Sequence, residues 1–114
     1  MARTPRLPTE YVTANDGYDI VFRRAGVAAA DRTWTAQARV HPDDTLPTTT
    51  FELTATDGTG EHAGKAIINL HLDGAVTLAL PRSVQCDLQE TAPGLEPLTI
   101  ARWRLVVEPQ ITSP

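Results

Sequence analysis

The chain has 114 residues, which is room for one domain with a core of modest size. Its formal net charge is −4 at pH 7, so it lacks the basic footprint that nucleic-acid binding requires. No apolar run approaches the roughly 20 residues that span a bilayer, and the basic N-terminus has no apolar stretch of the kind found in signal peptides.

The N-terminal segment is predicted to be an extended arm, covering residues 1–15. Pro5 and Pro8 exclude a helix there and favour extended backbone. Such a segment is either a frayed terminus or an arm that orders against a neighbouring subunit. Residues 16–112 are predicted to form a single domain.

Strand patterns begin at Glu10–Thr13, which a turn at residues 15–17 ends. The next strand is expected over Tyr18–Arg23, followed by an alanine-rich loop or short helical turn at Val27–Asp31. Thr33–Val40 then alternates as a half-buried strand does. The side chains expected to face the core are those of Tyr18, Ile20 and Phe22 in the first of these strands and of Trp34, Ala36, Ala38 and Val40 in the second.

Residues 41–48 are predicted to be a loop, since they contain two prolines and an Asp pair. Alternation resumes over Thr50–Thr56 and again over Lys65–Leu72. Asp73-Gly74 lies between apolar runs and predicts a hairpin turn, with a further strand through Val76, Leu78 and Leu80. The inward side chains expected in the two alternating strands are Phe51, Leu53 and Ala55, then Ala66, Ile68, Leu70 and Leu72.

Two long strands close the chain, Ser83–Glu90 and Pro97–Glu108, joined by a turn at Pro93-Gly94. In the last strand, Leu98 and Ile100 share one parity, whereas Trp103, Leu105 and Val107 share the other. A regular strand does not change parity, so we predict a β-bulge near Ala101-Arg102. The alternative is a strand that changes from one sheet to another.

Seven or eight short strands without a convincing helix predict an all-β protein, an immunoglobulin-like antiparallel β-sandwich. A closed barrel is the alternative. Trp34 lies on the third strand, where immunoglobulin-like sandwiches often keep a core tryptophan, although the flanking disulfide cannot form with Cys86 as the only cysteine.

Residues that could carry chemistry are few, and we expect no enzyme, no metal site and no cofactor. His41, His62 and His71 lack the spacing of a zinc site, and Asp43-Asp44 lacks the further oxygens that calcium needs. Cys86 has the inward parity of a buried thiol. Arg102 and Arg104 flank Trp103, which indicates either a basic, aromatic binding edge or, more simply, a core tryptophan between two solvent-facing arginines.

Four segments carry a family resemblance. They read Gly17-Tyr-Asp-Ile-Val-Phe22, Thr33-Trp-Thr-Ala-Gln-Ala-Arg39, Asp87-Leu-Gln-Glu-Thr-Ala-Pro-Gly94 and Val107-Glu-Pro-Gln-Ile-Thr112. In this order they resemble the small immunoglobulin-like minor tail and baseplate proteins of phages, including the N-terminal domain of siphophage baseplate upper proteins. The chain departs from that pattern at Arg32-Thr33, where a glycine usually precedes the tryptophan, and at Pro81–Val84, which lacks the usual tyrosine.

The resemblance implies a non-catalytic structural virion protein, a minor tail or baseplate (tail-tip) subunit, assembled in the host cytoplasm. Its partners would be other tail proteins, in several copies around the tail axis, with no nucleic acid and no membrane. The alternatives are a carbohydrate-binding sandwich, in which Tyr11 and Tyr18 would be the exposed rings, and a head decoration or connector protein. The residues expected at a protein interface are Arg3, Arg6, Leu7, Tyr11, Arg102, Arg104 and Ile111.

Overall fold

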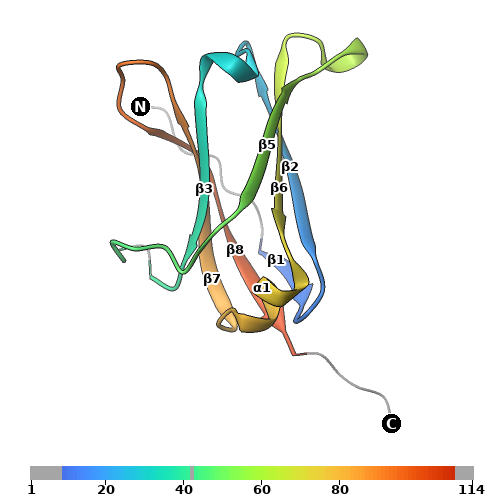
Figure 1. Ribbon diagram of the computed structural model, residues 1–114, viewed down its shortest axis with the longest axis vertical. Coiled ribbons are helices and arrows are strands. Elements are labelled where there is room, and N and C mark those ends of the chain that lie inside the picture. The colour runs from blue at the N-terminus through green and yellow to red at the C-terminus, as the bar shows by residue number, and fades with distance from the viewer. Residues whose placement is uncertain (1–8, 42, 110–114) are drawn as a thin grey trace.

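Two β-sheets pack face to face around one hydrophobic core in a computed structural model that describes residues 9–41 and 43–109 (Figure 1). One sheet has five strands in the order β1-β8-β7-β3-β4, and the other has three in the order β2-β6-β5. The predicted β-sandwich is therefore confirmed. Its strands are β1 (Glu10–Thr13), β2 (Tyr18–Ala25), β3 (Thr33–Arg39), β4 (Thr49–Thr50), β5 (Glu52–Asp57), β6 (Lys65–Leu72), β7 (Ser83–Thr91) and β8 (Leu98–Glu108).

The strand order is that of an immunoglobulin-like sandwich. Every strand pair among the described residues is antiparallel except β1 with β8, which run parallel, with Glu10 opposite Leu105. β1 lies within the segment assigned to the N-terminal arm, yet it is an edge strand of the five-stranded sheet. Residues 1–8 of that arm lie outside the described residues.

Alternation in the sequence places the core side chains. The central strand of the smaller sheet, β6, buries every second residue, and these four side chains are at most 2% exposed: Ala66, Ile68, Leu70 and Leu72. β7 and β8 do the same from the opposite sheet, with Val84, Cys86, Leu88, Trp103, Leu105 and Val107 buried. A short 3-10 helix, η1 (Ala29–Asp31), occupies the predicted alanine-rich turn, and a second, η2 (Gly60–His62), lies between β5 and β6.

The central aromatic of the core is Trp103, from β8. Its ring centroid lies 5.2 Å from that of Phe22 and 5.8 Å from that of Phe51, and Tyr18 contacts Phe51 at 6.3 Å. Trp34 also packs against the core but is only partly buried, with its indole N–H donated to the carbonyl of Ala29 at 3.0 Å. Trp103 thus takes the central position that Trp34 was expected to hold.

The predicted hairpin at Asp73-Gly74 is wrong, because the segment after it forms a short helix, α1 (Gly74–Ala79). Both edges of β6 are already paired, with β2 on one side and β5 on the other, so no hairpin partner could pair with it. The chain instead crosses to the other sheet through α1. Thr77 holds the helix in place, since it is fully buried and its hydroxyl contacts the Asp16 carbonyl at 2.7 Å.

The close approach of α1 to the turn before β2 leads to a prediction about Gly74. A Cβ atom at this position would lie 2.3 Å from the backbone carbonyl oxygen of Asn15. Gly74→Ala should therefore lower the free energy of unfolding by about 1–3 kcal/mol, as other overpacking substitutions do. Gly17→Ala is the control, because its nearest contact would be an ordinary 3.5 Å. Equal stability of the two variants in urea unfolding would contradict the prediction.

The predicted strand Thr50–Thr56 is divided at Phe51. Before it, β4 pairs with β3; after it, β5 pairs with β6 in the other sheet. Phe51 is buried at the crossing, and its backbone N–H is donated to the carbonyl of Ala36 at 2.9 Å. The chain therefore changes sheets here, whereas the sequence offered that possibility only for the last strand.

The predicted β-bulge in the last strand is present. Leu88 pairs with Ala101 and Gln89 with Thr99, which leaves Ile100 as the extra residue of β8, next to the predicted pair. The bulge restores the inward parity of Ala101, Trp103 and the residues that follow. Val40, predicted to face the core, is instead 38% exposed, because β3 ends at Arg39.

Candidate functional site

Three of the predicted interface residues lie on the outer face of the five-stranded sheet. Arg102 and Arg104 are exposed on β8, on the parity opposite to buried Trp103. Tyr11 is 63% exposed on β1, where it pairs with Val106, the next residue of that outward parity. The structure thus brings residues far apart in the sequence to one face, beside the edge strand of the sheet. Arg3, Arg6, Leu7 and Ile111 lie outside the described residues.

A carboxylate lies between arginines on this face. Asp87 pairs across the sheet with Arg102, and its Oδ2 is 3.7 Å from Nη1 of Arg39. Partial burial raises the pKa of Asp87 above its usual value, and the charges of Arg39 and Arg102 oppose that rise. We use the name β1–β8 face for the surface made by Tyr11, Arg39, Asp87, Arg102 and Arg104.

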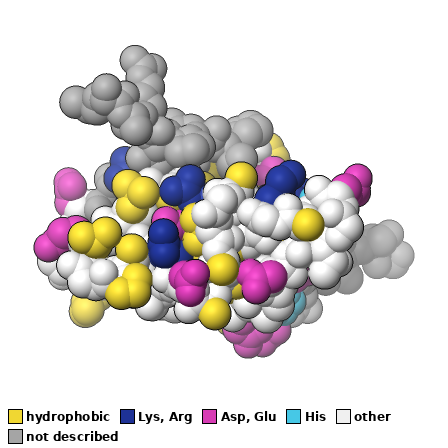
Figure 2. Space-filling view, turned by 90° about the horizontal axis from the view of Figure 1, so that it is seen from above, with side chains coloured by type: hydrophobic (Ala, Val, Ile, Leu, Met, Phe, Trp, Pro, Cys, Tyr) yellow, Lys and Arg dark blue, Asp and Glu magenta, His cyan; other side chains and the backbone are white. Residues whose placement is uncertain are grey.

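A second charged group closes one end of the sandwich. Glu90 continues the inward series of β7 and is only 6% exposed. The Nε of Arg24, at the end of β2 in the other sheet, donates to its Oε1 at 2.9 Å, and Arg32 lies 3.6 Å from Oε2. Because Glu90 belongs to the five-stranded sheet and Arg24 to the three-stranded sheet, their ion pair ties the two sheets together. Figure 2 looks onto the upper end of the molecule, where basic, acidic and hydrophobic side chains are interspersed.

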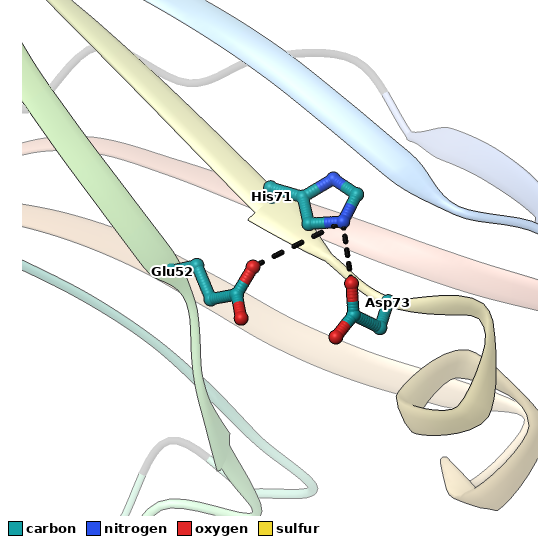
Figure 3. Close-up of side chains that lie close together, drawn as sticks. All are labelled: Glu52, His71 and Asp73. Carbon is teal, nitrogen blue, oxygen red and sulfur yellow. Dashed lines mark hydrogen bonds and ion pairs between the residues drawn. The ribbon is translucent and has the colours of Figure 1, made fainter.

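A third group crosses the outer face of the three-stranded sheet. His71 of β6 pairs with Asp19 of β2 on one side and with Glu52 of β5 on the other. Its Nδ1 is 2.7 Å from Asp19 Oδ1, its Nε2 is 2.8 Å from Asp73 Oδ1, and the same nitrogen is 4.0 Å from Glu52 Oε2. Figure 3 shows Glu52 and Asp73 converging on the ring. The hydrogen bond to Asp19, which has the larger effect, and the hydrogen bond to Asp73 raise the pKa of His71 above its usual value.

The remaining candidates from the sequence stay separate. Cys86 is buried, and burial, with the nearby Asp87 charge, raises the pKa of its thiol to about 12, which makes it a poor nucleophile. His62 Nε2 lies 3.5 Å from Oε1 of its chain neighbour Glu61. Asp44 closes its own loop by accepting the backbone N–H of His41 at 3.1 Å.

Sequence reasoning missed the second and third groups for different reasons. The Glu90 group carried a signal, because Glu90 follows Val84, Cys86 and Leu88 at intervals of two and must share their inward parity. The His71 group carried none, since its members are brought together by strand register and not by spacing along the chain.

Comparisons with known proteins add no family: no protein-family model matches the sequence, and no curated protein matches it. Within residues 9–41 and 43–109, no helix has both the length and the apolar character to cross a membrane.

Proposed function

We propose that this chain is a structural subunit of a phage tail, a minor tail or baseplate protein that binds neighbouring tail proteins without catalysis. The observation that carries the proposal is the β1–β8 face, where an exposed tyrosine and two exposed arginines lie together beside an edge strand. Tyrosine and arginine are enriched where proteins bind one another, and a sheet edge can pair with another chain.

The location of the family-like segments supports the same proposal. One of the four segments spans β3, two others overlap β2 and β7 in part, and the fourth begins at the end of β8. These strands contribute to the core of the sandwich, and β3, β7 and β8 carry four of the five residues of the β1–β8 face. A module of this kind is a rigid body whose outer surfaces can differ from one subunit to the next while the core stays the same.

The charged groups on the β1–β8 face differ in how far they are available to a partner protein. Asp87 is partly buried between arginines, so it is partly paired within the chain, whereas Arg102 and Arg104 extend into solvent. A partner surface with carboxylates opposite these arginines and an apolar pocket for the Tyr11 ring would complement it.

The proposal is tested by mass spectrometry of purified virions, which should contain the chain. A charge reversal at the face, Arg104→Glu, should remove the protein from particles while it still folds. Arg23→Glu is the matched control, because Arg23 is exposed on β2 of the opposite sheet. Absence of the unchanged chain from virions contradicts the proposed function, whereas equal incorporation of both variants contradicts the assigned face.

The carbohydrate-binding alternative now depends on one ring. Tyr18 is only 6% exposed and Trp103 only 4%, so neither can stack on a sugar, and Tyr11 is the one strongly exposed aromatic of the described residues. Loss of glycan-array binding in Tyr11→Ala, with virion incorporation unchanged, would favour that alternative.

A further inference from the structure

The outer face of the three-stranded sheet gathers several carboxylates around one imidazole. Asp19, His71 and Glu52 form one rung across three strands, and Asp73 reaches the same ring from the end of β6. Three carboxylates thus surround one imidazole. Like charges gathered on one sheet face are destabilising unless a positive charge lies between them. A proton on the ring supplies one such charge, and a bound metal ion would supply two.

The hydrogen bond that His71 Nδ1 donates to Asp19 holds the imidazole ring in one orientation. Asp19 Oδ1 lies 2.7 Å from Nδ1 of His71, so Nδ1 keeps its proton and donates it to the carboxylate. Nε2 lies 2.8 Å from Asp73 Oδ1, so in the imidazolium it also donates an N–H, and it offers a lone pair to a metal once that proton has left. It faces both Glu52 and Asp73. Metal-binding histidines almost always show this pattern, with the second nitrogen held by a carboxylate or carbonyl.

The side chain of Asp73 contacts His71 and does not cap the helix that follows it. It is the N-cap residue of α1, a position where an aspartate side chain commonly accepts a backbone N–H of the first helical turn. Its side chain makes no such bond here, and Oδ1 lies 2.8 Å from Nε2 of His71 instead. The carboxylate therefore points toward the imidazole and not toward the helix.

We propose that His71 Nε2, Glu52 and Asp73 bind a zinc-class divalent ion, with Asp19 orienting the imidazole. The three ligand atoms lie within 4.8 Å of one another. Two ligands on a tetrahedral zinc ion are about 3.3 Å apart, given bonds of about 2.0–2.1 Å. The distances of 2.8 Å and 4.0 Å from Nε2 lie on either side of that value, and the exposed carboxylates can close the difference by side-chain rotation.

The donor set selects the metal. An imidazole nitrogen with two carboxylates suits zinc, cobalt or nickel, whereas calcium and magnesium prefer oxygen ligands alone. Three protein ligands leave a fourth position for water on the solvent side. Binding replaces the Nε2 proton of the imidazolium with the metal, and that proton is released to solvent, so affinity should rise with pH. This inference does not rest on the proposed virion role.

The test is calorimetric titration of the full chain, without a histidine tag, with zinc chloride at pH 7.5. The expected result is saturable binding of one ion per chain, abolished in His71→Ala and weakened in Glu52→Gln. Asp19→Asn should weaken binding by about tenfold or more, as loss of a carboxylate behind a metal-binding histidine does. His62→Ala is the matched control, because His62 lies beside Glu61 in η2, outside the His71 group, and its loss should leave binding unchanged.

Circular dichroism establishes that each variant is folded, and Glu52→Gln keeps the test decisive if His71→Ala unfolds. Absence of saturable zinc binding by the unchanged chain would overturn the proposal. So would binding that survives in folded His71→Ala, or an affinity for zinc that is unchanged in both Glu52→Gln and Asp19→Asn. Calcium chloride should give no saturable heat, and competition by calcium at equal concentration would contradict the assigned metal class.

Discussion

Trp103→Ala is expected to lower the free energy of unfolding by about 3–5 kcal/mol, a large fraction of the stability of a small domain. Trp103 is 4% exposed and lies at the centre of the aromatic group, in contact with Phe22 from β2 and Phe51 at the sheet crossing. Its removal leaves a cavity between the two sheets, which stiff flanking strands cannot collapse to fill. Urea unfolding followed by circular dichroism measures the loss.

Trp103→Phe separates ring packing from the indole nitrogen. The indole N–H of Trp103 and the hydroxyl of Tyr18 are both buried and interact with each other, but neither makes a hydrogen bond of good geometry. Phenylalanine keeps a ring in place and removes only the poorly bonded N–H, so its cost should be clearly smaller than that of alanine. A loss as large in Trp103→Phe as in Trp103→Ala would mean that the Trp103 nitrogen, and not the ring, stabilises this part of the core.

Arg24→Ala is expected to cost about 2–3 kcal/mol, because it leaves the buried Glu90 carboxylate without its closest partner. The remaining arginine, Arg32, lies farther away, at 3.6 Å, and compensates only in part. Most surface ion pairs contribute much less, but here the carboxylate is taken out of water and joins the two sheets. Thermal or urea unfolding of the variant gives the measurement.

Arg23→Ala provides the matched comparison, since Arg23 is the preceding residue of β2 but is exposed on the opposite face. It should change stability by no more than about 0.5 kcal/mol. Adding Glu90→Gln to Arg24→Ala should recover part of the loss, because the uncompensated charge is then removed. If Arg23→Ala and Arg24→Ala proved equally stable, the ion pair at this end would contribute nothing to holding the sheets together.

The sequence predicted those features of the fold that depend on alternation alone. The inward faces of β6 and β7 follow directly from the spacing of their apolar residues, and so does the bulge beside Ala101. Two of the wrong predictions share a cause. Asp73-Gly74 and Phe51 lie at points where the chain changes sheets, and local pattern cannot tell a hairpin from a crossover. Only the pairing of both edges of β6 decides between them.

In the candidate sites, too, the exposure of single residues follows from alternation, whereas their grouping depends on strand pairing. Exposure of Arg102 and Arg104 could be predicted from parity, but their proximity to Tyr11 depends on the parallel pairing of β1 with β8. The His71 group depends on the register of β6 with two other strands. Register comes from how the whole core packs, so neither grouping was accessible to reasoning from spacing.

The parallel pairing of β1 with β8 has a consequence for how the molecule assembles in time. Glu10 is synthesised before its partner Leu105, which is made only after the strands that lie between them, β2 to β7. β1 therefore cannot dock until synthesis of the domain is almost complete, and a chain halted before β8 leaves β1 without its partner and β7 with an open edge. Folding should be cooperative and comparatively slow, as is usual where closure waits for the most distant contact.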